Sequence, residues 1–147
     1  MLKHDLEDFL HKKIPATALL DFKVFSVDDT QLIMEAPLHI NHNDKGTGFG
    51  GSIEALAIIT GWSVTWTLLK QTHHEANVVI KSSQSSFIAP VKSNFQARCH
   101  LPDKEEIASL WERFTCKGKA RLSLHVKVFS EETLCMELHA QYVFLHT

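Results

Sequence analysis

The sequence predicts an α+β fold in which an antiparallel, six-stranded sheet wraps around one long, buried central helix. Residues 53–69 have the length of a helix, and their apolar side chains fall on every face of the helical wheel, so no face can be left in water. Most other segments alternate apolar and polar residues with the period of two that is typical of half-buried strands. A sheet curled around the helix buries both sets of apolar side chains.

Length and charge limit the possible organisation and partners. The chain has 147 residues, of which 44% are hydrophobic, and this is enough for one domain with one core over residues 1–147. The formal net charge is −2. We therefore expect no nucleic-acid-binding surface, because such a surface needs clustered lysines and arginines.

The sequence also favours a cytoplasmic protein. The first turns carry acidic residues, unlike a secretory signal, and we expect none. The long apolar helix contains Glu54 and five hydroxyl side chains, which argues against a membrane-spanning role. Cys99, Cys116 and Cys135 lie far apart and are odd in number, so we expect free thiols rather than a disulfide framework.

The first third of the chain predicts a surface helix followed by a hairpin. Residues 2–10 carry apolar side chains at helical spacing, and Pro15 stops this helix shortly afterwards. Residues 20–24 and 32–36 alternate apolar and polar side chains, and the Asp28–Asp29 pair between them predicts the turn.

The segments after the central helix predict two strands, a helix and two more strands. The first two strands cover residues 78–90, which have a serine-rich middle, and residues 95–101. Asp103 and Glu106 have capping-box spacing and open an amphipathic helix that Gly118 ends. Strictly alternating strands follow, and they cover residues 121–128 and 134–144.

Six antiparallel strands around a central helix form the hotdog arrangement. One such layer covers only one side of its helix and leaves its edge strands open. We therefore expect a homo-oligomer, either a dimer or a dimer of dimers.

A glycine-rich loop opens directly into the central helix. Four of six positions are glycine, namely Gly46, Gly48, Gly50 and Gly51. Glycine lets the backbone approach a ligand closely, and the unpaired amides of the first helical turn point at that ligand with the positive end of the helix dipole. The loop therefore predicts an oxyanion or phosphate site.

Three motifs resemble one known family. Residues 41–52 read NHNDKGTGFGGS, the central helix contains Thr60-Gly61-Trp62, and residues 87–91 read FIAPV. Together they resemble the "putative thioesterase" domain of the YiiD type over nearly the whole chain. The paired asparagines and the Phe-x-Gly-Ser turn are the most specific part of this resemblance.

The resemblance implies a fold, a substrate class and a binding mode. Members are hotdog proteins, and the implied substrate is an acyl thioester of coenzyme A or of acyl carrier protein. In hotdog enzymes the amides at the N-terminus of the buried helix hold the thioester carbonyl, which here implies Gly50, Gly51 and Ser52. The pantetheine tail lies between two subunits. We expect no cofactor and no metal ion.

The sequence departs from the better-known hotdog thioesterases at two positions. In those enzymes the turn reads His-Gly-Gly, and a catalytic aspartate or glutamate lies two turns into the helix. The equivalent residues here are Phe49 and Ile58. Neither does acid-base chemistry, so the usual carboxylate mechanism does not carry over.

Several polar residues near the glycine loop are candidates for catalysis. Asn43 and Asn41 either orient water and polarise a carbonyl or brace their own loop. Glu54 is either a general base or a charge that complements the helix dipole, and Asp44 is either a base or a solvated side chain. The predicted catalytic set is Asn43, Gly51, Ser52, Asn41 and Glu54.

A second set of residues is predicted to bind the substrate. The serines of the third strand either line a pocket shared with a neighbouring subunit or form an exposed edge. Trp62 either walls an acyl pocket or packs in the core. The predicted substrate-binding set is Thr47, Phe49, Gly50, Trp62, Ser82, Ser83 and Ser85.

Three functions fit these features. The first is hydrolysis of an acyl thioester, with the carbonyl oxygen held by the Gly51 and Ser52 amides and water directed by Asn43. The second is decarboxylation of a malonyl-type thioester, which needs an oxyanion hole but no strong base. The third is a non-catalytic module that binds acyl thioesters, since no acidic residue occupies the usual helix position.

Overall fold

The structure is a computed structural model that describes residues 2–147. The described residues form four helices and one six-stranded sheet. The elements in chain order are α1 (Leu2–Lys13), α2 (Pro15–Leu19), β1 (Lys23–Val27), β2 (Gln31–Ala36), α3 (Gly50–Thr72), β3 (Asn77–Phe87), β4 (Phe95–His100), α4 (Lys104–Lys117), β5 (Lys119–Ser130) and β6 (Thr133–Leu145).

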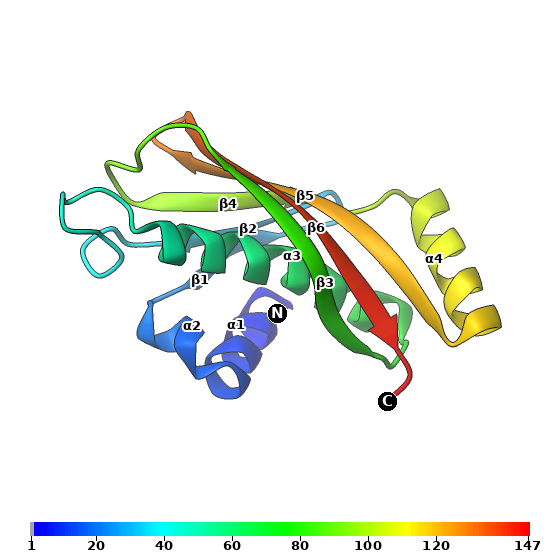
Figure 1. The fold of residues 1–147 in the computed structure, drawn as a ribbon. Coiled ribbons are helices and arrows are strands. Elements are labelled where there is room, and N and C mark those ends of the chain that lie inside the picture. Colours follow the sequence, from blue (N-terminus) through cyan, green and yellow to red (C-terminus); the bar gives the residue numbers. More distant parts are fainter. Residues whose placement is uncertain (1) are drawn as a thin grey trace.

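The sheet is fully antiparallel and wraps around α3. Its strand order is β1-β2-β4-β5-β6-β3, so β3 crosses over to pair with β6. In Figure 1 the sheet covers one side of α3, α1 and α2 lie on the other side, and α4 lies at one end. The predicted α+β hotdog fold is confirmed.

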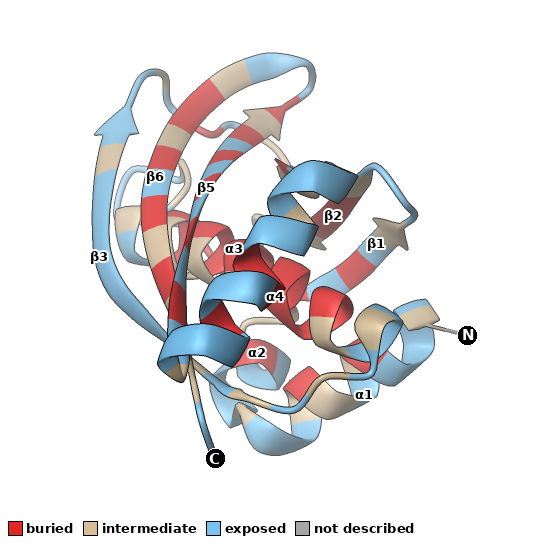
Figure 2. Ribbon diagram, turned by 90° about the vertical axis from the view of Figure 1, so that its right-hand side faces the viewer, coloured by how far each residue is buried: buried red, intermediate tan, exposed pale blue. Residues whose placement is uncertain are grey.

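Burial explains why α3 is apolar all round. This helix of 23 residues is long and apolar enough to cross a membrane, yet 67% of its most apolar window is buried inside the domain. Figure 2 shows it behind the sheet, and β5 alternates buried and exposed residues as the sequence pattern predicts. Most of the apolar side chains of α3 are therefore packed inside the domain.

The N-terminal segment differs from the sequence-based expectation in one respect. Pro15 lies just after α1, as expected, and it is also the first residue of a second helix, α2, because proline suits the first position of a helix. The expected start of the first strand at residue 20 was therefore wrong, since Leu20 caps α2 and β1 begins at Lys23. The predicted hairpin of β1 and β2 is confirmed.

The predicted helix ends of α4 are confirmed. The Asp103 carboxylate accepts a hydrogen bond from the Glu106 amide at 2.8 Å and so caps the helix N-terminus. Gly118 ends the helix with a φ of 74°, a left-handed conformation that glycine adopts without steric cost.

The two edge strands of the sheet, β1 and β3, differ in how far other elements cover them. At the β1 edge, α1 packs against the strand, and the Glu7 carboxylate accepts a hydrogen bond from the Val24 amide at 2.8 Å. At the other edge, β3 has no strand on its outer side among the described residues, and it exposes Val79 and Ile80. An open edge with apolar side chains is a surface on which another strand can pair.

Candidate functional site

The N-terminus of α3 presents three main-chain amides without helical partners. Phe49 is the N-cap residue, has an extended backbone and makes no side-chain cap bond within the described residues. The first intrahelical bond runs from the Ile53 amide to the Phe49 carbonyl oxygen at 3.0 Å. The amides of Gly50 and Gly51 are therefore free to bind an oxygen atom from outside the helix, and the amide of the buried Ser52 also lacks a helical partner.

Small residues keep this helix end accessible. Gly51 is exposed, and a Cβ atom added there would lie 2.5 Å from the Phe49 ring. A Cβ atom on Gly50 would lie 3.9 Å from the Phe87 ring. Both rings are more than half exposed, so the amides lie between two aromatic side chains at the surface. The Phe49 ring approaches the backbone closely at Gly51, whereas Gly50 leaves room for a Cβ atom at an ordinary contact distance.

Asn43 braces the loop that leads to α3. Its side-chain oxygen accepts hydrogen bonds from the Lys45 and Thr47 amides at 2.9 and 3.1 Å, and its side-chain nitrogen donates to the Thr47 hydroxyl at 2.9 Å. Both ends of the amide group are thus engaged within residues 43–48. Thr47, predicted to bind substrate, takes part in the same bracing.

Asn41 anchors the loop to the rest of the domain. Its side chain is 1% exposed, and its nitrogen donates hydrogen bonds to the carbonyl oxygens of Leu20 and Pro37, both at 2.9 Å. Its main-chain carbonyl oxygen accepts a hydrogen bond from the Phe49 amide at 2.8 Å. The two asparagines therefore determine where α3 begins, and a direct role of either in catalysis stays a prediction.

Glu54 is paired with a serine of the third strand. The carboxylate is half-buried in the first turns of α3, and the Ser85 hydroxyl lies 2.6 Å from each of its oxygens. The sequence predicts Glu54 and Ser85 only as separate candidates, because 31 positions separate them and no local pattern joins a helix to a strand.

The other predicted binding residues lie apart from the helix end. Ser82 and Ser83 are exposed on β3. The Trp62 ring stacks on Phe9 of α1 with ring centroids 6.0 Å apart, and its indole nitrogen donates to the Val78 carbonyl oxygen at 3.2 Å. Eleven residues of helix place Trp62 about 16 Å along the axis from Gly51. Only a long acyl chain bound at Gly51 would reach it.

The described cysteine and histidine residues do not form a nucleophilic or metal-binding centre near this site. Cys99 is buried, and burial raises the pKa of its thiol to about 12, so it stays protonated at neutral pH. His39 and His42 line a shallow pocket on the loop. The described part of the chain holds no group of three or more histidine, cysteine, aspartate or glutamate side chains that could bind a metal ion.

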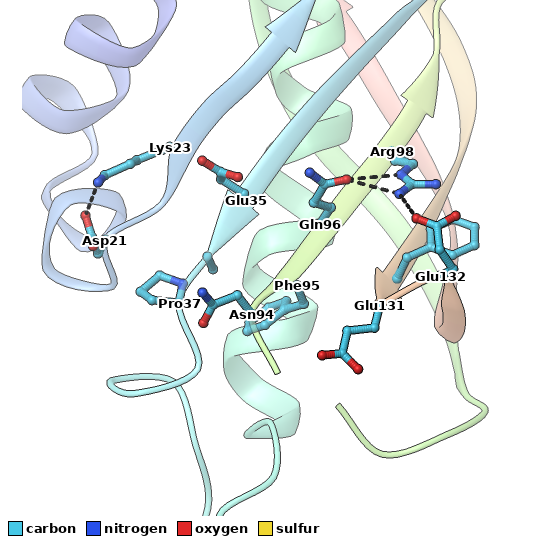
Figure 3. A pocket seen from close by; sticks show the side chains of 12 residues that line it. Asp21, Lys23, Glu35, Pro37, Asn94, Phe95, Gln96, Arg98, Glu131 and Glu132 are labelled. Carbon is cyan, nitrogen blue, oxygen red and sulfur yellow. Dashed lines mark hydrogen bonds and ion pairs between the residues drawn. The ribbon is translucent and has the colours of Figure 1, made fainter. Parts of the chain in front are cut away.

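A polar pocket of about 400 Å³ lies on the other face of the sheet. Its lining includes Gln96 and Arg98, which alternate along β4 with residues buried against α3 and so point away from that helix. Figure 3 shows Arg98 between Gln96 and Glu132, with the acidic side chains of Asp21, Glu35 and Glu131 around the opening. This pocket contains none of the predicted site residues.

Solved structures share this fold over nearly the whole chain. A protein of unknown function from Chlorobaculum tepidum TLS is 30% identical, with a TM-score of 0.95, and the match covers 99% of this chain and 95% of that one. A protein described as "the putative thioesterase from Shewanella oneidensis" is 28% identical, with a TM-score of 0.88 and coverage of 98% and 97%. A Pseudomonas aeruginosa protein at 19% identity, with a TM-score of 0.86 and coverage of 98% and 95%, shows likeness of fold alone.

A family model matches almost all of the chain. The family is described as "Putative thioesterase (yiiD_Cterm)", and the match covers residues 3–146. Thioesterases are hydrolases, and the matched range includes the glycine loop, α3 and every strand of the sheet. The chain therefore belongs to the YiiD_C thioesterase family and takes the hotdog fold.

Proposed function

We propose that this protein hydrolyses acyl thioesters of coenzyme A or acyl carrier protein at the N-terminus of α3. The observation that carries this proposal is the uncapped, accessible helix end at Gly50 and Gly51, whose amides have no helical partner. In the tetrahedral intermediate of thioester hydrolysis, negative charge develops on the former carbonyl oxygen. The Gly51 and Ser52 amides would stabilise that charge together with the helix dipole.

The proposed active unit is a homodimer in the cytoplasm. The β3 edge exposes Val79 and Ile80 at one end, and Phe87 and Ile88 are exposed at the other end, where Phe87 lies beside Gly50. A second copy that pairs along this edge would cover the apolar side chains. The pantetheine arm would then lie between the two subunits. Cysteines 99, 116 and 135 are free, which fits a reducing compartment.

Dimerisation should therefore be sensitive to charge on the β3 edge. The double variant Val79→Lys with Ile80→Lys is expected to sediment as a monomer and to lose thioester hydrolysis. Leu19→Lys is the matched control, because Leu19 is exposed on α2, away from β3. Sedimentation velocity at assay concentration measures the oligomeric state of both variants, and thiol release measures their hydrolysis. A monomeric, active unsubstituted protein would contradict the dimer.

A substrate panel tests the reaction itself. Acetyl, medium-chain, long-chain and malonyl thioesters are incubated with the purified protein, and free thiol and carbon dioxide are measured. Thiol release from acyl thioesters is the expected result. Carbon dioxide without thiol would instead establish malonyl-thioester decarboxylation, which the apolar Ile58 at the usual acid position favours as the second candidate. Tight binding without either product would leave only a binding module.

A further inference from the structure

The proposed reaction needs a group that takes a proton from water, and the described residues offer one beside the α3 amides. Residues three and four positions apart lie on the same face of a helix, so Glu54 stands one turn above Gly50 and Gly51. We infer that Glu54 is the general base of this proposed thioesterase and that Ser85 of β3 is the residue that positions its carboxylate.

The register between α3 and β3 supports this pairing. Phe87 lies beside Gly50, and Ser85 lies beside Glu54. Two strand residues span about 6.6 Å and four helix residues span about 6 Å, so one step along the strand's inner face matches one turn of the helix. Ile58, which occupies the position of the usual acid, lies four residues or one turn further along α3. In this chain the carboxylate is therefore one turn closer to the amides.

The environment leaves the Glu54 carboxylate able to accept a proton. Among residues 2–147, no lysine, arginine or histidine forms an ion pair with it. The Ser85 hydroxyl oxygen lies 2.6 Å from each carboxylate oxygen of Glu54. The carboxylate is half-buried, and its remaining lone pairs can accept hydrogen bonds from water. Asp44, the other acid near the loop, is 81% exposed at its side chain and has only Lys45 as a neighbour of opposite charge.

The step that follows balances without a further reactant. Water attacks the thioester carbon while Glu54 accepts its proton, and the carbonyl oxygen becomes the oxyanion held by the Gly51 and Ser52 amides. The carbon–sulfur bond then breaks, and the leaving thiolate takes the proton from the Glu54 carboxyl group. The products are the carboxylic acid and the free thiol, and Glu54 is again ionised.

The test compares steady-state kinetics of matched variants on the best substrate of the panel. Glu54→Gln keeps the shape of the side chain but accepts no proton, and we expect kcat to fall by roughly 10²- to 10⁴-fold with little change in KM. Ser85→Ala should lower kcat by roughly 10- to 100-fold through misplacement of the carboxylate, and Ser85→Thr, which keeps the hydroxyl, should recover most of it.

Two controls isolate the pair. Asp44→Asn changes the exposed acid, and Ser86→Ala removes a hydroxyl from the opposite face of the same strand. Both should keep the unsubstituted kcat. Thermal melts check folding, and the serine variants keep the test decisive if Glu54→Gln fails to fold.

The outcomes separate this inference from the proposed function on which it rests. Hydrolysis by the unsubstituted protein together with an unchanged kcat in Glu54→Gln would overturn the base and leave thioester hydrolysis standing. An unchanged kcat in Ser85→Ala, or no recovery in Ser85→Thr, would overturn the positioning role. No thiol release by the unsubstituted protein would overturn the proposed function and the base with it.

Discussion

A proline at position 51 is expected to reduce kcat for thioester hydrolysis by roughly 10²- to 10³-fold, the usual effect of losing one oxyanion donor. Proline has no amide hydrogen, so Gly51→Pro deletes one of the two donors proposed to hold the oxyanion. The fold should tolerate the change, because position 51 lies in the first turn of α3, where the amide makes no intrahelical bond.

Gly51→Ala is the matched control for this experiment. It introduces the same Cβ atom, which displaces the exposed Phe49 ring, but it keeps the amide hydrogen. The difference in kcat between the alanine and proline variants therefore reports the loss of the amide hydrogen, together with any effect of the proline ring on the Gly50 backbone. Circular dichroism and thermal melts should show both variants folded. Equal activity of the two would mean that the Gly51 amide binds no oxyanion.

Gly61→Ala is expected to lower the free energy of unfolding by about 1–3 kcal/mol. Overpacking costs about 1–3 kcal/mol and one weakened buried hydrogen bond costs about 1 kcal/mol, while the higher helix propensity of alanine offsets about 1 kcal/mol. Gly61 is buried in the middle of α3, and an added Cβ atom would lie 2.8 Å from the Cζ atom of Tyr142 and closer still to its hydroxyl oxygen. That hydroxyl donates to the Ile58 carbonyl oxygen at 2.6 Å and is fully buried.

A double-mutant cycle with Tyr142→Phe identifies the cause. Removal of the hydroxyl costs about 1 kcal/mol by itself. In the Gly61→Ala background it also removes the nearest clashing atom. The double variant should therefore be more stable than the sum of the two single effects, as measured by denaturant-induced unfolding. Gly50→Ala serves as the stability control, since its Cβ atom meets the Phe87 ring at an ordinary 3.9 Å. Strict additivity would refute the steric explanation.

Tyr142 and Gly61 also illustrate what sequence patterns leave open. The alternation of β6 places Tyr142 on the buried face, and burial raises the pKa of its hydroxyl. A glycine inside an apolar helix indicates that something approaches closely. The identity of the approaching side chain depends on how α3 crosses β6, and no local periodicity encodes that crossing.

The paired asparagines show the same division at the site. The sequence predicts where the loop lies, and it leaves two roles open for each asparagine, namely catalysis and bracing of the loop. The hydrogen bonds of Asn43 stay within the loop, as the bracing role predicts, whereas the bond of Asn41 to Leu20 joins segments that only the fold brings together. These hydrogen bonds make both side chains supports of the helix end.

Sequence patterns predict the fold class, the buried helix, the succession of strands along the chain and the loop that opens the site. These features follow from hydrophobic periodicity, glycine content and capping residues, all of which act within a few neighbouring positions. Three features can be seen only in the folded chain. Ser85 donates a hydrogen bond to Glu54, α1 covers the β1 edge while β3 has no such cover among the described residues, and Gly61 contacts Tyr142. The physical reason is that each of these contacts joins elements distant in the chain, whose relative placement is set by the packing of the whole core.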